Sequence, residues 1–122
     1  MKSTLRCQTC QNTYPSSEPR WKCTCGGLLT VDFHARFPLE KIKKRKPTLW
    51  RYREALPINQ DRSIVSFDEG FTPLIPEELF GKNVLIKQEY LFPSGSYKDR
   101  GASVLISKIR ELRLKKVVED SS

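Results

Sequence analysis

The chain has 122 residues, of which 38% are hydrophobic and 30% charged, and its formal net charge is +8. This composition excludes a disordered protein and a membrane-spanning one, because no apolar run approaches the length of a bilayer span. The N-terminal residues lack the apolar stretch of a secretory signal, so we expect a cytoplasmic protein with reduced cysteines.

Four cysteines near the N-terminus form two close pairs. Two residues separate Cys7 from Cys10, one separates Cys23 from Cys25, and twelve lie between the pairs. Each pair can supply two sulfurs from one turn, and a hairpin can bring the turns together around a tetrahedral zinc ion. We therefore expect a structural zinc ribbon over residues 1–34, since four sulfurs leave no open position for water or substrate.

Two alternatives to zinc stay open at this point. Four cysteines allow three disulfide pairings, or they can be four unrelated thiols. The second pair also departs from the common C-x-x-C spacing. His34, nine residues after Cys25, is interpreted as a surface histidine rather than a fifth ligand.

A basic stretch from about Ala35 to Pro47 opens a connecting segment over residues 35–83. The cluster of basic residues from Lys41 to Lys46 can contact nucleic acid, but no aromatic residues are interleaved with it, and we interpret it as a solvated helix face or linker. Because zinc ribbons often bind nucleic acid, a nucleic-acid- or protein-binding module is the second hypothesis. The basic residues are Lys41, Lys43, Lys44, Arg45 and Lys46.

Residues 84–122 predict a strand, a helix and the start of a second strand. The apolar run 84–89 reads as the first strand. Ser96 and Asp99 have the spacing of a capping box, which predicts a helix from Ser96 to about Arg113. Val117 and Val118 predict the second strand. This succession predicts a parallel βαβ unit and thus an α/β fold.

The predicted helix is amphipathic. Ser103 and Lys108 are on its polar side. Two strands and one helix cannot bury both faces of a parallel sheet, so we expect the truncated start of a larger domain. The predicted buried face consists of Ala102, Leu105, Ile106, Ile109 and Leu112.

Four segments, in order, resemble those of threonine synthases and their relatives in the tryptophan-synthase-β-like family of pyridoxal-phosphate (PLP) enzymes. The most specific is SGSYKDRG at 94–101, which is similar to T-G-S-F-K-D-R-G, although Phe92 precedes Pro93 where the family usually has Asn. The other three are LWRY with LP at 49–57, EGFTPL at 69–74 and VVEDSS at 117–122.

The resemblance implies a PLP-dependent lyase with an open α/β fold. Lys98 would form the Schiff base with the cofactor and perform most of the proton transfers. Ser121 and Ser122 would begin the loop that holds the substrate carboxylate. A threonine synthase converts O-phospho-L-homoserine and water to L-threonine and phosphate; threonine dehydratase-like and cysteate synthase-like activities are alternatives.

The family's glycine-rich phosphate cradle has no counterpart among the six glycines of the chain. A PLP phosphate needs several backbone N–H donors, so we expect this chain alone to be inactive. The expected partner is a small phosphorylated amino acid, while a membrane or nucleic acid is disfavoured and oligomerisation of a full-length enzyme is left open.

Overall fold

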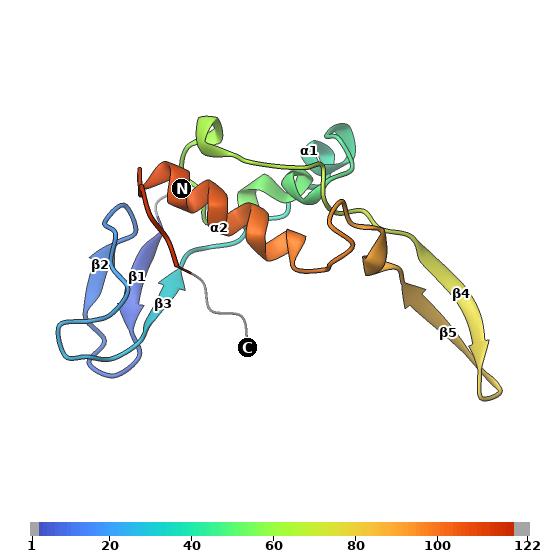
Figure 1. Ribbon diagram of the computed structural model, residues 1–122, viewed down its shortest axis with the longest axis horizontal. Coiled ribbons are helices and arrows are strands. Elements are labelled where there is room, and N and C mark those ends of the chain that lie inside the picture. The colour runs from blue at the N-terminus through green and yellow to red at the C-terminus, as the bar shows by residue number, and fades with distance from the viewer. Residues whose placement is uncertain (1–2, 119–122) are drawn as a thin grey trace.

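The computed structural model describes residues 3–118, which form a three-stranded sheet, a central group of helices and a two-stranded hairpin. These parts follow one another along the long axis of the molecule (Figure 1). The expected mixture of helices and strands is confirmed. Within the described residues, no helix has both the length and the apolar character needed to cross a membrane.

The N-terminal sheet consists of β1 (Thr4–Cys7), β2 (Thr13–Pro15) and β3 (Leu29–Asp32), in the order β2-β1-β3. Both pairings are antiparallel, and Leu5 in β1 lies opposite Tyr14 on one side and Val31 on the other. Three short antiparallel strands thus flank the cysteine turns. The loops between them carry the two cysteine pairs to the same end of the sheet.

The central part contains α1 (Leu39–Lys44) and the 3₁₀ helices η1 (Leu49–Ala55) and η2 (Asp61–Ser63). Thr48 caps η1, because its Oγ1 accepts the N–H of Trp50 at 3.2 Å. The basic residues from Lys41 to Lys46 lie on and directly after α1, and most of them form ion pairs. These pairs are Lys41 and Arg45 with Glu54, Lys43 with Glu40, and Lys46 with Asp68.

The hairpin consists of β4 (Leu74–Leu79) and β5 (Lys82–Lys87), which pair antiparallel. Phe80 and Gly81 connect them with φ angles of 52° and 72°. Two positive φ angles in a two-residue loop are typical of the type I′ turns that favour hairpins.

The parallel βαβ unit expected over residues 84–122 is not formed in the part of the chain that the structure describes. The predicted first strand exists as β5, but its partner is β4, and Val117 and Val118 are not in a strand. A tight turn brings β4 and β5 together at little cost in loop-closure entropy, whereas a parallel partner requires a long crossover and covered sheet faces. The expected boundary between residues 83 and 84 falls inside the hairpin, and the domain limits stay a prediction.

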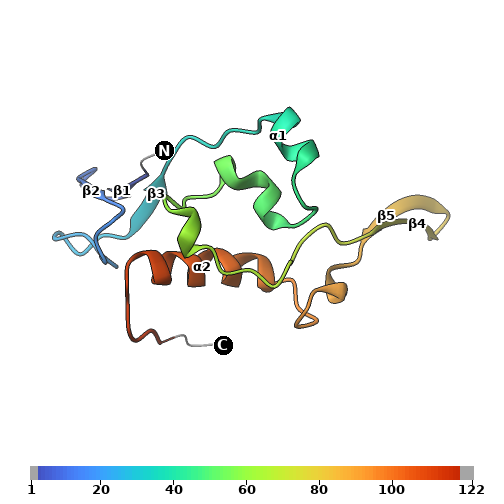
Figure 2. The same ribbon diagram turned by 90° about the horizontal axis from the view of Figure 1, so that it is seen from above.

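The long helix α2 spans Asp99–Glu111, beside the connecting segment that contains η2 (Figure 2). Its N-cap is Lys98 rather than the predicted Ser96. Ser96 instead accepts the N–H of Lys98 at 3.2 Å, and the Asp99 carboxylate accepts the N–H of Ser94 at 3.0 Å. The capping residues thus close the preceding turn instead of the first helical turn.

The face of α2 that packs is also different from the predicted one. Ser103 and Ser107 are buried, whereas Leu105 and Ile106 are 53% and 42% exposed. Small hydroxyl side chains let α2 approach the backbone at Val65, with which both serines form hydrogen bonds. The amphipathic pattern is real, but its apolar side is only partly covered within residues 3–118, where Ile109 and Leu112 are half-buried.

Candidate functional site

The four cysteine sulfurs gather at one end of the N-terminal sheet, and all four lie within 4.8 Å of one another. The Sγ atoms of Cys7 and Cys25 are 3.6 Å apart, and those of Cys10 and Cys23 are 3.5 Å apart. A tetrahedron of sulfurs around zinc has edges of about 3.8 Å, given Zn–S bonds of about 2.3 Å. All four cysteines are free, which argues against the disulfide alternative.

The two turns that hold these sulfurs are closely packed. Cys7 Sγ accepts the N–H groups of Thr9 and Cys10 at 3.4 and 3.5 Å. Gly27 lies against this turn, and a Cβ atom there would approach Thr9 Oγ1 to 2.6 Å and Cys7 Sγ to 2.8 Å. Because only glycine fits at position 27, the second cysteine turn can approach the first closely enough for the four sulfurs to gather.

The thiols perturb one another strongly. Hydrogen bonds from Tyr14 and from the Cys25 backbone lower the pKa of Cys23 to about 5. The pKa of Cys10 is raised to about 12, because bonds with the thiols of Cys23 and Cys25 outweigh the N–H of Asn12, which lowers it. Four sulfurs at these distances are compatible with a bound cation such as Zn²⁺, which takes four sulfur ligands and favours their thiolate form. His34 is exposed and is not part of the cluster, as expected.

A second cluster joins two of the segments that carry the family resemblance. Arg100 forms a bidentate pair with Glu89, with N–O distances of 2.9 and 2.8 Å. Thr72 Oγ1 donates to the same carboxylate at 2.5 Å, and Lys87 Nζ donates to the Thr72 carbonyl. The guanidinium lies 4.7 Å from the centre of the Phe92 ring. The hydrogen bonds from Arg100 and Thr72 lower the pKa of Glu89 to about 2.

The LWRY segment reaches the same region. The N–H of Leu49 donates to the Glu69 carbonyl at 2.7 Å, and Trp50 Nε1 donates to Ser103 Oγ at 2.9 Å. Gly70 has a φ of 115°, and a Cβ atom on it would lie 2.5 Å from the Leu49 nitrogen. Three segments that are far apart in the sequence are thus joined around the start of α2.

Lys98 stands at the N-cap of α2 with an exposed side chain. Its neighbours are engaged elsewhere, Asp99 with Ser94 and Arg100 with Glu89. Among the ion pairs formed within residues 3–118, none includes Lys98. The amine is therefore accessible, as a lysine that binds an aldehyde cofactor must be. Ser121 and Ser122 lie outside the described residues.

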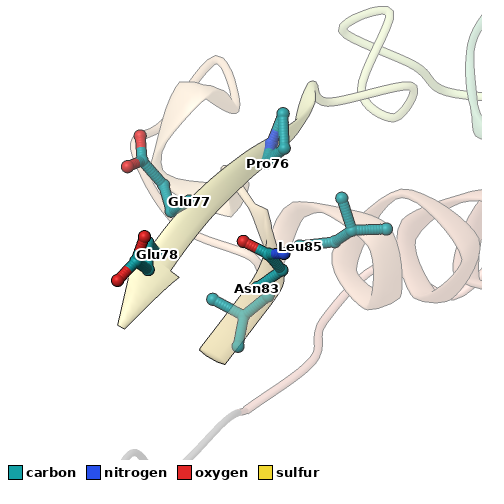
Figure 3. Close-up of a pocket in the computed structure, with 6 residues that line it drawn as sticks. Pro76, Glu77, Glu78, Asn83 and Leu85 are labelled. Atoms are coloured by element: carbon teal, nitrogen blue, oxygen red, sulfur yellow. The ribbon is translucent and has the colours of Figure 1, made fainter. Parts of the chain in front are cut away.

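Two hollows on the surface differ in their chemistry. One, of about 330 Å³, lies on the hairpin, and the carboxylates of Glu77 and Glu78 make it unsuitable for a phosphate (Figure 3). The other, of about 550 Å³, lies beside the Arg100 cluster and contains two cationic side chains. It is lined by Thr48, Leu49, Tyr52, Phe71, Lys87, Glu89 and Arg100.

Residues 65–122 match the family of pyridoxal-phosphate dependent enzymes. That part of the chain, which includes Lys98 and its neighbours, is thus similar to a portion of a PLP-enzyme domain.

The curated relatives are named more specifically, and all those described below are threonine synthases. The chain is 38% identical over 117 residues to the enzyme of Methanocaldococcus jannaschii, covering 88% of this chain and 29% of the relative. It is 35% identical over 122 residues to that of Methanosarcina acetivorans, covering 93% and 30%, respectively. The Synechocystis enzyme is 40% identical over 73 residues, which are 55% of this chain and 19% of the relative.

The expected resemblance to threonine synthases is thereby confirmed over nearly the whole chain, which spans about 30% of the length of the two archaeal relatives. Sequence reasoning missed the roles of Tyr14 at the cysteines and of Glu89 beside Arg100. Thr72 and Arg100 lay within the recognised segments, but no local pattern indicated that they share one carboxylate.

Proposed function

We propose that this chain carries the cofactor-binding lysine of a threonine synthase-like, PLP-dependent lyase, and that this lysine is Lys98. The proposal is supported most by one observation. Segments 49–57, 69–74 and 94–101 meet around the start of α2. The Lys98 side chain is exposed and takes no part in the polar contacts that its neighbours form. Such an arrangement fixes the backbone of a reactive lysine and keeps its side chain free.

The cofactor, when bound, supplies the electron sink for carbanion chemistry. Lys98 would bind its aldehyde carbon and afterwards move protons at Cα and Cβ of the substrate. The proposed reaction is the conversion of O-phospho-L-homoserine and water to L-threonine and phosphate. Arg100 would not contact substrate in this scheme, because Glu89 already neutralises it; instead it would hold the turn before α2 in place.

The test uses a chimera in which this chain replaces the matching N-terminal part of the Methanocaldococcus jannaschii enzyme. Borohydride reduction in the presence of PLP should fix the cofactor to Lys98, as mapped by mass spectrometry. Lys98→Ala should abolish both the labelling and the release of phosphate from O-phosphohomoserine, whereas Lys108→Ala should retain both. Labelling of Lys87 or Lys108 instead would refute the assignment.

We propose further that the 122-residue chain alone has no turnover. Its sequence has no glycine cluster to bind the cofactor phosphate, and Leu105 and Ile106 on the apolar side of α2 are exposed. The same phosphate-release assay on the isolated chain should show no activity above background. Measurable threonine formation would contradict this part of the proposal. Threonine dehydratase-like chemistry would appear instead as 2-oxobutyrate formed from threonine by the chimera.

We also propose that Cys7, Cys10, Cys23 and Cys25 bind one structural zinc ion. The sulfur spacings and the free thiols support this. Protein purified without added metal should contain close to one zinc per chain, and Cys23→Ser should release it, whereas Ser17→Ala in the same loop should not. Absence of metal from reduced protein would refute the zinc site. The cytoplasmic location stays a prediction.

A further inference from the structure

The two cysteine turns support their sulfurs differently. In the first turn, Cys7 Sγ accepts N–H groups from the residues two and three positions later, Thr9 and Cys10. In the second turn, the residue three positions after Cys23 is Gly26, and its N–H bonds to the Cys23 carbonyl at 2.9 Å. That N–H is therefore directed at oxygen, and Cys23 Sγ lacks the second backbone donor that Cys7 Sγ has.

A tyrosine hydroxyl takes the place of this second backbone donor at Cys23 Sγ. Tyr14, in β2, has its hydroxyl oxygen 3.0 Å from Cys23 Sγ. The N–H of Thr24 approaches the same oxygen at 3.4 Å and occupies one of its lone pairs. Because a metal-bound thiolate carries no proton, the Tyr14 O–H is the donor and the sulfur the acceptor.

The tyrosine is also fixed in position by its own surroundings. The guanidinium of Arg20 stacks 4.2 Å from the centre of the Tyr14 ring. The backbone of Tyr14 is paired with Leu5 in β1, the strand that ends at Cys7. The hydroxyl is thus held by the same sheet that carries the first cysteine turn, and it does not depend on the metal for its placement.

We propose that Tyr14 is a positioning residue of the four-cysteine site: its hydroxyl hydrogen bond replaces the missing backbone donor at Cys23 and slows metal loss. This inference rests on the proposed binding of zinc. Hydrogen bonds to metal ligands typically change metal affinity 10- to 100-fold when they are removed.

The test compares Tyr14→Phe with the unaltered chain and with Tyr90→Phe, which changes an exposed tyrosine in the 3₁₀ helix η3 (Glu89–Leu91). Each zinc-loaded chain is mixed with an excess of a chromophoric chelator, and the rate of zinc transfer is followed. Tyr14→Phe should release zinc roughly 10-fold faster, and Tyr90→Phe at the unaltered rate. Phenylalanine retains the ring that packs against Arg20, so circular dichroism should be unchanged.

A second measurement reports on the sulfur itself. With Co²⁺ in place of zinc, the thiolate-to-cobalt charge-transfer band of Tyr14→Phe should move to longer wavelength, because a thiolate that loses a hydrogen bond is a better electron donor. Equal release rates, or faster release with an unmoved band, would overturn the role of Tyr14. If the unaltered chain takes up neither metal, the zinc proposal fails and this inference falls with it.

Discussion

Glu89 is the residue on which two recognised segments converge, because its carboxylate accepts hydrogen bonds from both Arg100 and Thr72. Its side chain is 28% exposed and that of Arg100 is 34% exposed, so solvent screens the pair only in part. A bidentate pair of this kind stabilises more than a typical surface ion pair.

Glu89 should make the chain sensitive to acid. Since folding lowers the pKa of this carboxyl from its ordinary value of 4.5 to about 2, its stabilising effect is present above pH 4.5 and is lost as the pH falls toward 2. Between these pH values the unaltered chain should lose roughly 1 kcal/mol more unfolding free energy than Glu89→Gln. Urea denaturation at each pH measures this difference. Glu77→Gln, at an exposed position in β4, should follow the unaltered chain, and parallel curves for all three would contradict the role of Glu89.

Gly70 is the residue that lets the segment before the hairpin lie against η1. Its φ of 115° and the 2.5 Å distance that would separate a Cβ atom from the Leu49 nitrogen both exclude a side chain. Gly70→Ala should therefore lower the unfolding free energy by about 2 kcal/mol or more. Gly101→Ala is the matched change, because nothing lies within 4 Å of the position its Cβ would take and alanine favours a helix. Equal effects of the two substitutions would show that the contact with Leu49 is unimportant.

At the scale of elements, α2 is attached to the connecting segment through hydroxyl groups and one carboxylate. Ser107 accepts the N–H of Val65 at 2.8 Å and donates to the Ser103 carbonyl at 2.7 Å. At the other end of the helix, the Glu111 carboxylate accepts the N–H groups of Asn59 and Gln60 at 2.6 and 2.9 Å. Both contacts satisfy backbone donors of a segment that has little regular structure.

Ser107→Ala should cost about 1–2 kcal/mol of unfolding free energy, because the N–H of Val65 loses its acceptor. Leu105→Ala, on the exposed side of the same helix, should change stability by less than about 0.5 kcal/mol. Chemical denaturation of the two variants compares the two faces directly. If Leu105→Ala is the more damaging change, the helix packs through its apolar face in solution.

At the scale of the whole molecule, the net charge of +8 raises the question of nucleic-acid binding. The basic residues around α1 are largely paired with carboxylates, which leaves less free positive charge than the sequence suggests. This pairing favours the solvated-helix interpretation over a binding surface.

We expect weak, sequence-independent binding to DNA that falls steeply between about 50 and 200 mM salt, as counterion release requires. Replacing Lys43 and Lys44 by Gln should weaken it further at low salt. Fluorescence anisotropy with duplexes of unrelated sequence measures both effects. Tight, sequence-selective binding at physiological salt would instead support the nucleic-acid module as the function of this chain.

Several features of this protein can be predicted from the sequence, because the signals for them are local. The spacing of Cys7, Cys10, Cys23 and Cys25 predicts a four-sulfur cluster, and the structure brings the four sulfurs together. The segments at 49–57, 69–74 and 94–101 indicate the enzyme family, which the relatives confirm. The capping-box spacing and the apolar periodicity predict a helix from Ser96 to about Arg113, and α2 is present over Asp99–Glu111.

Only the tertiary structure decided which surfaces meet. Strand β5 pairs with β4 through a two-residue turn, although its pattern alone fits a parallel partner equally well. Helix α2 packs through Ser103 and Ser107, because hydrogen bonds to Val65 outweigh the pattern of its apolar side. Tyr14 reaches Cys23 and Arg100 reaches Glu89 across gaps of nine and eleven residues. A sequence specifies each local preference, but such contacts depend on how elements dock, which is decided by packing and hydrogen bonding between distant segments.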